Sequence, residues 1–352
     1  MSAVRLPPAA RVLIVMMSAV GDTVHVLPVV TALKRHDPAI HITWVLQPGP
    51  ASLVRGHPDV DEIILFERRA GWRAFTGIRR KLAGRKFDVV INLQVYAKAS
   101  MVTAIASAPV KLGFDKARAR DWNWLVTTDR IPPRGQRHVQ DQYFEFLDVL
   151  GVNPEPVTWN LGPWDGERDA QRAFLGRLNR PAASLVIGTT RAEKDWVPQR
   201  WVELSDALYE RFGLQPVLVG GRSERELATE RVIMEHARHP VVSTLGVPLR
   251  ELVGIFDASE LVVALDTGPM HIATALGTPT VALIGYYNPK RIGPYRRFHD
   301  LLVDAYGDPG EDYPITPEKR PGRTKTITVD QVLEKVAVWD RKYRGRVRPD
   351  SV

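Results

Sequence analysis

The 352-residue sequence contains no cysteine. This absence excludes disulfides, thiolate nucleophiles and cysteine-ligated zinc or iron–sulfur sites, and it fits a reducing compartment. The sequence also lacks the dinucleotide fingerprint G-x-G-x-x-G, the P-loop G-x-x-x-x-G-K-[ST], the zinc-protease pattern H-E-x-x-H and the serine-hydrolase pattern G-x-S-x-G. The sequence therefore gives no support for classical dinucleotide binding, P-loop, zinc-protease or serine-hydrolase chemistry.

Long apolar runs are also missing from the N-terminus. The apolar stretch Val12–Met17 is too short for a membrane-spanning helix and is followed at once by a turn. No signal-peptide cleavage pattern follows it. The pattern predicts a β-strand here and a cytoplasmic protein.

The length and composition predict a protein with two domains. A chain of 352 residues is longer than one hydrophobic core usually grows, and 44% hydrophobic residues with 9 Trp supply ample core material. Short β-rich runs alternate with helical patterns, which favours doubly wound parallel sheets covered by helices on both faces. Segment 151–166 is rich in Pro and Gly and predicts the linker, so we expect domains at residues 1–160 and 161–352.

The strands and helices expected from these patterns fall in both halves. Strands are expected at 12–17, 40–46, 62–66, 88–93, 184–189, 215–220, 241–245, 261–265 and 280–284. Helices are expected at 24–35, 72–83, 97–107, 138–150, 199–212, 224–237, 249–257, 270–276 and 329–339. Two such sheets in tandem are expected to face each other across a cleft.

The net charge of +8 is unevenly distributed. Residues 68–86 hold eight Arg or Lys and no acid, while Trp72, Phe75, Ile78 and Leu82 fall at helical spacing within them. Such a helix could lie on an anionic surface, or it could pack an ordinary apolar stripe on its own domain, which is the commoner case. No nucleic-acid-binding motif accompanies the charge, so nucleic acid is not expected as a partner.

The segment 261–285 predicts a phosphate site. A buried strand ends at Asp266, Gly268 allows the turn, and Pro269 suits the first helical turn. The helix that follows starts with free N–H groups at the carboxyl edge of the sheet, where its dipole favours an anion by about 0.3–1 kcal/mol. His271 lies in the first turn, and Thr267 could either cap the helix or face the ligand.

The segment 186–201 offers hydroxyls and cations at another strand end. Thr189, Thr190, Arg191 and Lys194 fall within one loop, a combination that suits a diphosphate leaving group in a metal-free enzyme. A solvated surface position for Lys194 is an equally good interpretation.

Two further turns are candidates. In the first of them, after the strand expected at 215–220, Gly220 and Gly221 permit close approach of a ligand. Glu224 could accept hydrogen bonds from ribose hydroxyls there, or it could simply suit the helix dipole. In the second, after the strand expected at 12–17, Asp22 could take a proton from an attacking hydroxyl, or it could cap a helix that starts near Thr23.

Taken together, these segments resemble the lipopolysaccharide heptosyltransferases of glycosyltransferase family 9 over essentially the whole chain. The most specific pieces are SAVGDTVHVLPVVTALKR near the start and DTGPMHIATALGTPTVALIG later, with GTTRAEKDWVPQRW and GGRSERELA between them. The resemblance implies a GT-B fold, in which the first Rossmann-like domain holds the acceptor and the second the donor, ADP-heptose, with no metal. Asp59-Val60-Asp61 matches the acidic pair that metal-dependent glycosyltransferases use. It lies in a Pro-led turn before a short strand, however, and we interpret it as part of that turn.

The resemblance also implies roles for particular residues. Asp22 matches the catalytic base of an inverting transfer. The donor-binding positions are Thr189, Thr190, Lys194, Glu224, Asp266, Thr267, Gly268 and His271. Lys111, Arg118 and Arg120 are candidate contacts to acidic Kdo or phosphate groups of the inner-core acceptor.

Two questions stay open at the sequence level. Where family members often carry Pro-Thr-Asp-Pro after the last donor-domain strand, this chain has Tyr286-Tyr287-Asn288-Pro289. The alternatives are therefore another GT-B enzyme that uses a different nucleotide sugar, or a noncatalytic sugar-nucleotide-binding module. An acceptor in an anionic inner leaflet would give the basic segment 68–86 a purpose, which predicts peripheral association with the inner face of the inner membrane.

Overall fold

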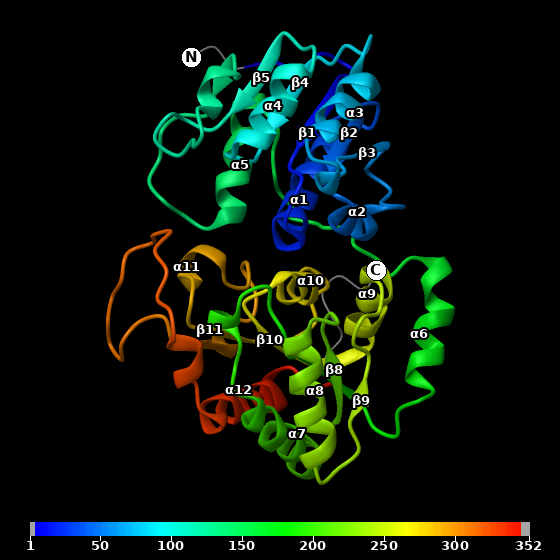
Figure 1. Cartoon of the computed structure of the whole chain (residues 1–352), viewed down its shortest axis with the longest axis vertical. Helices are drawn as coiled ribbons and strands as arrows, with labels where there is room; N and C mark the ends of the chain where they lie inside the picture. Colours follow the sequence, from blue (N-terminus) through cyan, green and yellow to red (C-terminus); the bar gives the residue numbers. More distant parts are fainter. Residues whose placement is uncertain (1–3, 346–352) are drawn as a thin grey trace. The chain divides into compact units, whose positions relative to one another are not determined.

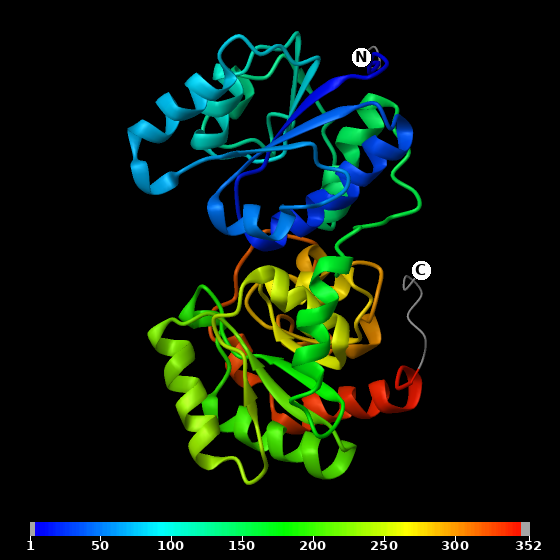
Figure 2. The same ribbon diagram turned by 90° about the vertical axis from the view of Figure 1, so that its right-hand side faces the viewer.

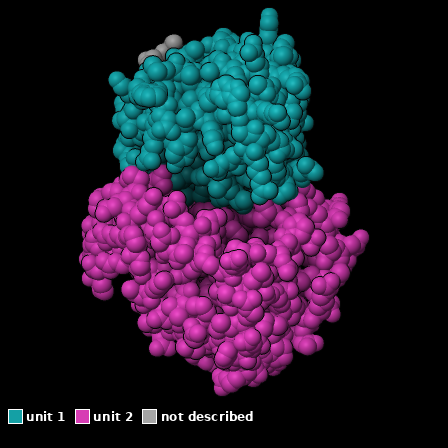
Figure 3. All heavy atoms as spheres, in the orientation of Figure 1, with its two compact units in different colours: residues 1–160 teal, residues 161–352 magenta. Residues whose placement is uncertain are grey.

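The structure is a computed structural model that describes residues 4–345. The chain divides into two compact units, unit 1 at residues 1–160 and unit 2 at residues 161–352 (Figure 3). The division lies within the Pro- and Gly-rich segment 151–166. Within the described residues each unit contains one six-stranded parallel sheet flanked by helices (Figure 1).

The sheet of unit 1 has the strand order β3-β2-β1-β4-β5-β6. Its strands are β1 (Arg11–Val15), β2 (His41–Leu46), β3 (Glu62–Leu65), β4 (Val89–Asn92), β5 (Val110–Gly113) and β6 (Asp129–Arg130). Val12 of β1 pairs with Ile42 on one side and Val89 on the other. The strand order reverses between β1 and β4, which makes the carboxyl ends of these two strands the topological switch point.

Helices cover both faces of this sheet (Figure 2). On one face α1 (Val20–His36) packs against α5 (Val139–Leu150) and α2 (Pro48–Val54). On the other face α3 (Trp72–Leu82) packs against α4 (Ala97–Ile105). The strands between them are buried on both sides, as the continuous apolar run of β1 requires.

The sheet of unit 2 repeats this arrangement, in the order β12-β11-β10-β7-β8-β9. Its strands are β7 (Ala182–Val186), β8 (Gln215–Val219), β9 (Val242–Ser243), β10 (Ser259–Leu265), β11 (Thr280–Ile284) and β12 (Leu302–Asp304). Val262 of β10 pairs with Ser184 of β7, so the strand order reverses between these two strands. The switch point of unit 2 therefore lies at the carboxyl ends of β7 and β10.

The helices of unit 2 form two packed groups. One group is α7 (Pro198–Phe212) with α8 (Glu224–His236) and the closing helix α12 (Val329–Lys342). The other is α9 (Leu249–Ala258) with α6 (Arg168–Leu175) and α10 (Gly268–Ala275), while the short α11 (Pro289–Ile292) follows β11. Trp201 of α7 and Trp339 of α12 are fully buried in the same core.

The predicted α/β fold with parallel sheets is confirmed, and most expected elements are present. The strand at 280–284 has its predicted bounds, whereas α1 begins at Val20, four residues before the expected start. The prediction missed β5, β6, β12, α2, α6 and α11, which are short or lie at sheet edges and so carry little apolar periodicity. No helix within residues 4–345 is long and apolar enough to span a membrane.

Two strand-end sites

The switch point of unit 2 gathers the donor-site candidates on one sheet edge. Thr189 and Lys194 follow β7, and Asp266 and His271 follow its neighbour β10. Because the carboxyl ends of parallel strands meet at one edge, segments that are more than sixty residues apart come together. The two segments that the sequence singled out first are therefore one site.

Lys194 and Asp266 form the centre of this site. The Lys194 ammonium lies 3.0 Å from an Asp266 carboxylate oxygen, and the side chains are only 9% and 8% exposed. Burial raises the pKa of the Asp266 carboxyl, and the neighbouring Lys194 opposes that rise. Lys194 is therefore a buried, fixed cation and not the solvated surface lysine that was the alternative interpretation.

The loop after β7 is held in shape by its own side chains. The buried Thr189 hydroxyl lies 2.7 Å from Asp195 Oδ1 and accepts a hydrogen bond from the Arg191 N–H at 3.2 Å. Arg225 of α8 pairs with Asp195 and donates to the Thr189 carbonyl at 3.1 Å. Thr190, in contrast, is exposed, so Thr189 shapes the loop while Thr190 is accessible to a ligand.

Helix α10 presents its N-terminus at the same edge. Thr267 is the N-cap residue, and Gly268 and Pro269 are the first helical residues. His271 lies in the first turn and is 8% exposed. Pro269 has no N–H and the Met270 N–H donates to the Thr267 carbonyl at 3.0 Å, so the Gly268 N–H and the helix dipole are what this end offers to an anion beside Lys194.

Glu224 and Glu226 have different surroundings at the turn after β8. Glu224 is exposed at the first position of α8, where it is available to a ribose. Glu226 instead accepts hydrogen bonds from the Gly221 N–H at 2.7 Å and the Ser223 N–H at 3.0 Å. The sequence reading missed Glu226, although the spacing Ser223-x-x-Glu226 is that of a capping box.

The glycine after β7 is required by this arrangement. A Cβ on Gly188 would lie 2.2 Å from Glu226 Cγ. The side chain that closes the β8 turn thus packs directly on the backbone of the β7 loop. Glu226 therefore connects the two loops that flank the site.

Asp22 lies at the switch point of unit 1. It is the third residue of α1, half-buried, and its Oδ2 accepts a hydrogen bond from the Ala19 N–H at 2.9 Å. The expectation that the helix starts near Thr23 was wrong, because Asp22 caps from within the helix. Capping fixes the carboxylate at the carboxyl edge of β1.

Gln94 supports the same loop from the neighbouring strand end. This buried side chain accepts a hydrogen bond from the Met17 N–H at 3.1 Å and donates to the Ser18 carbonyl at 2.8 Å. Gln94 comes two residues after β4, the strand on the other side of the switch point. The sequence reading missed it because a single glutamine carries no motif.

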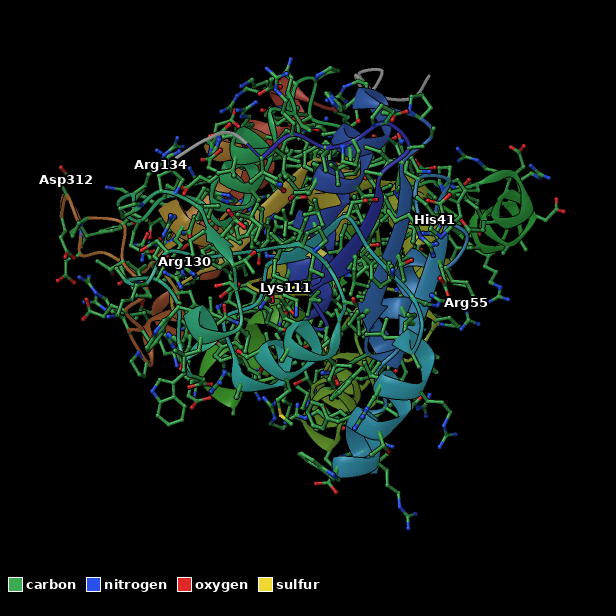
Figure 4. The ribbon with its side chains drawn as sticks, turned by 90° about the horizontal axis from the view of Figure 1, so that it is seen from above. His41, Arg55, Lys111, Arg130, Arg134 and Asp312 are labelled. Carbon is green, nitrogen blue, oxygen red and sulfur yellow. The ribbon has the colours of Figure 1, made fainter. Side chains whose placement is uncertain are left out.

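The three candidate acceptor contacts do not form a cluster of available cations. Lys111, labelled in Figure 4, lies on β5 and donates to the Ala104 carbonyl at 3.2 Å, and burial lowers its pKa. Arg118 is buried between Asp115 and Glu145; burial works against its charged form, but the two carboxylates raise its pKa overall. Arg120 is exposed.

The apolar stripe of the basic segment packs on its own unit. Phe75, Ile78 and Leu82 of α3 are buried in the core that also holds β1 and β4. Trp72, at the start of α3, is 70% exposed beside the exposed arginines. Three of the four apolar residues of this helix thus pack on their own domain, which is the commoner of the two interpretations. Trp72 is the one that stays exposed.

Two doubly wound α/β units of this kind are the GT-B fold. The sequence matches glycosyltransferase family 9 (heptosyltransferase) over residues 75–307, and the chain belongs to this family of enzymes. The predicted membership is confirmed.

Similar proteins agree with this family membership, and similar solved structures agree with the fold. The chain is 29% identical to lipopolysaccharide heptosyltransferase 1 of Pseudomonas aeruginosa over 94% of this chain and 91% of the relative. It is 27% identical to the lipopolysaccharide core heptosyltransferase OpsX of Haemophilus influenzae over 83% and 84% of the two chains. A family 9 glycosyltransferase from Veillonella parvula superposes with a TM-score of 0.81 at 22% identity over 96% of this chain and 99% of that one. The E. coli heptosyltransferase WaaC with ADP gives 0.74 at 24% identity over 94% and 99%.

Proposed function

We propose that this enzyme is an inverting glycosyltransferase that moves heptose from ADP-heptose to the inner core of lipopolysaccharide, with Kdo–lipid A or a heptosyl-Kdo acceptor. The names of the relatives support this substrate class, and so does the WaaC structure with ADP. The observation on which the proposal rests most is the buried Lys194–Asp266 pair beside the start of α10.

In this proposal the switch point of unit 2 holds the donor. Lys194 and the N-terminal end of the α10 dipole stabilise the charge that grows on the diphosphate as it departs. Glu224 accepts hydrogen bonds from ribose hydroxyls. The remaining donor-site residues are Thr190, Asp266, Thr267, Gly268 and His271, while Thr189 holds the loop that carries Thr190 in shape, and no metal takes part.

Asp22 would act as the general base in unit 1. The acceptor hydroxyl oxygen attacks the anomeric carbon of heptose, the bond from that carbon to the phosphate oxygen breaks, and ADP leaves with the bonding electrons. The hydroxyl proton passes to the Asp22 carboxylate. A capped carboxylate is a modest base, which is sufficient when the proton leaves late, as the glycosidic bond forms.

The decisive experiment incubates the enzyme with ADP-heptose and truncated lipopolysaccharide acceptors and measures the products by mass. We expect the acceptor to gain one heptose. Asp22→Asn should lower turnover by about 10²- to 10⁴-fold, with ADP affinity unchanged because the variant removes a proton acceptor and leaves Lys194 and the start of α10 in place. Full activity of Asp22→Asn would contradict its role as base, and a noncatalytic binding module would give no product with either protein.

We further propose that the protein is cytoplasmic and that unit 1, which binds the acceptor, associates peripherally with the anionic inner face of the inner membrane. The exposed arginines of segment 68–86 and Trp72 provide charge and an interfacial aromatic ring. Arg120 is the candidate among the three acceptor cations that is exposed, whereas Lys111 and Arg118 contact the acceptor only if their internal contacts are exchanged.

Flotation with vesicles tests this surface. The protein should float with vesicles that contain anionic lipid and not with neutral ones, and Trp72→Ala should weaken binding. Met234→Ala, which removes an exposed apolar side chain from α8 of unit 2, is the matched control. Equal flotation with both lipids, or equal loss in both variants, would argue against the proposal.

A further inference from the structure

A second lysine shares an aromatic ring with Lys194. We infer that Lys319 is a second diphosphate-binding cation and that Tyr287 is the platform that holds both lysines at the leaving group. This inference rests on the proposed function, and it adds a loop outside the four turns described above to the donor site.

Tyr287 belongs to the same sheet edge as Lys194. It comes three residues after β11, the neighbour of β10, and so follows the third adjacent strand end of the site. The Lys194 ammonium lies 5.0 Å from the centre of the Tyr287 ring, and the Lys319 ammonium lies 6.0 Å from it. Both distances are within the reach of a cation–π interaction.

The loop that carries Lys319 is fastened to the segment after β11. The backbones of Tyr287 and Lys319 form an antiparallel bridge, and the Arg320 N–H donates to the Tyr286 carbonyl at 2.9 Å. On the far side of the loop, the Asn288 amide donates to the Pro314 carbonyl at 2.7 Å. This loop is the orange segment beside α11 in Figure 1, and its outer end carries the exposed Asp312 that is labelled in Figure 4.

Side-chain ion pairs hold the rest of the loop. Arg320 makes two hydrogen bonds of 2.7 Å to the Glu311 carboxylate, and Arg323 pairs with Asp308 at 2.6 Å. Gly285, directly after β11, lets the backbone at Thr324 pack against it, since a Cβ on Gly285 would lie 2.4 Å from the Thr324 nitrogen. Lys319 is therefore presented from a fixed loop.

The charges of the two lysines are balanced differently. Lys194 is neutralised by Asp266, whereas Lys319 is exposed and makes no ion pair within residues 4–345. Because no acid balances Lys319 within the described residues, its charge is available to an anion bound at this strand end. A nucleoside diphosphate offers two phosphate groups to such a pair, whereas a nucleoside monophosphate offers one.

Calorimetric titration of ADP and AMP into the full chain tests the inference. Lys319→Ala should weaken ADP binding by about 3- to 10-fold, the usual worth of one partly exposed charge-assisted contact, and should leave AMP binding nearly unchanged. Lys325→Ala, which removes another exposed lysine from the end of the same segment, should leave both affinities unchanged. Tyr287→Phe should keep ADP affinity because the ring remains, and Tyr287→Leu should lose it.

The outcomes separate this inference from the proposed function. ADP affinity that is the same in Lys319→Ala as in the native protein, or an equal loss in Lys325→Ala, would overturn the role of Lys319 and leave the proposed function standing. A loss in Lys319→Ala for UDP or GDP as well as for ADP would support the two-lysine site, because the contact is to the diphosphate. Equal affinity of the native protein for ADP, UDP and GDP would contradict ADP as the specific leaving group. A native protein that binds no nucleoside diphosphate would overturn both.

Discussion

Lys194 and Asp266 form a buried ion pair of 3.0 Å between two strand ends that are seventy-two residues apart in the sequence. Each side chain enters the site from one side of the switch point, Lys194 from the loop after β7 and Asp266 from the end of β10. The pair therefore links the two loops and sets the position of the cation that the proposed mechanism needs.

Breaking this pair should affect stability and binding separately. Lys194→Met and Asp266→Asn each leave one buried charge without its partner, so each should lower the free energy of unfolding by about 3–5 kcal/mol. The double variant Lys194→Met/Asp266→Leu should recover most of that stability but not ADP affinity. Denaturant unfolding and calorimetric titration measure the two effects; a double variant that binds ADP normally would remove Lys194 from the donor site.

The stability deficit of Lys194→Met should depend on pH. Burial already raises the pKa of Asp266, and removing the ammonium that opposes this raises it further. A carboxyl whose pKa is higher in the folded state binds its proton more tightly there, so its contribution to stability is present at low pH and is lost as pH rises through the raised pKa. The deficit relative to the native protein should thus be smaller at acid pH than at alkaline pH, and Asp266→Asn, which lacks the carboxyl, should not follow this trend. A deficit in Lys194→Met that is constant with pH would contradict the buried position of Asp266.

Gln94 is expected to act on Asp22 through the loop between them. Gln94→Ala removes the acceptor of the Met17 N–H and the donor to the Ser18 carbonyl, which should cost about 1–3 kcal/mol of stability. We expect kcat to fall while ADP affinity in unit 2 is unchanged. Gln94→Glu keeps the acceptor and should give an intermediate kcat, and the exposed Gln199→Ala is the control. An unchanged kcat with lowered stability would make Gln94 purely structural.

The two glutamates of α8 should behave in opposite ways. Glu224→Gln should weaken ADP binding with little change in the melting temperature, because the side chain is exposed. Glu226→Ala should lower the melting temperature, because the N–H groups of Gly221 and Ser223 lose their acceptor. Gly188→Ala should resemble Glu226→Ala, since its Cβ would displace that side chain. The reverse assignment of effects would exchange the two roles.

Much of the site could be predicted from the sequence because it consists of strand ends. A buried apolar strand followed by Gly, Thr or Asp and then a helix is a local pattern, and it placed Asp266, Thr267 and His271 correctly at a helix entrance. Parallel pairing then brings such turns to one edge, which is why Lys194 and Asp266 could be expected to converge.

What could not be predicted depends on long-range packing. The partners of Lys111 and Arg118 lie up to twenty-seven residues away and are not visible in local spacing, so these cations looked available in the sequence. The contact of Lys319 with Tyr287 depends on a loop that returns to the sheet after β12 and has no periodic pattern. Gln94 was missed for the same reason, since its importance comes from the loop it holds, whereas Glu226 had a local signal in its capping-box spacing.

The central claim is that the sheet edge around Lys194 holds ADP as the leaving group. Thermal unfolding of the native protein and of Lys194→Met in the presence of ADP, UDP or GDP tests it most directly. ADP at about one hundred times its dissociation constant should stabilise the native protein by about 2.7 kcal/mol, with UDP and GDP giving much less and Lys194→Met showing little response to any of them. Equal stabilisation by UDP or GDP, or an undiminished ADP effect in Lys194→Met, would contradict the account.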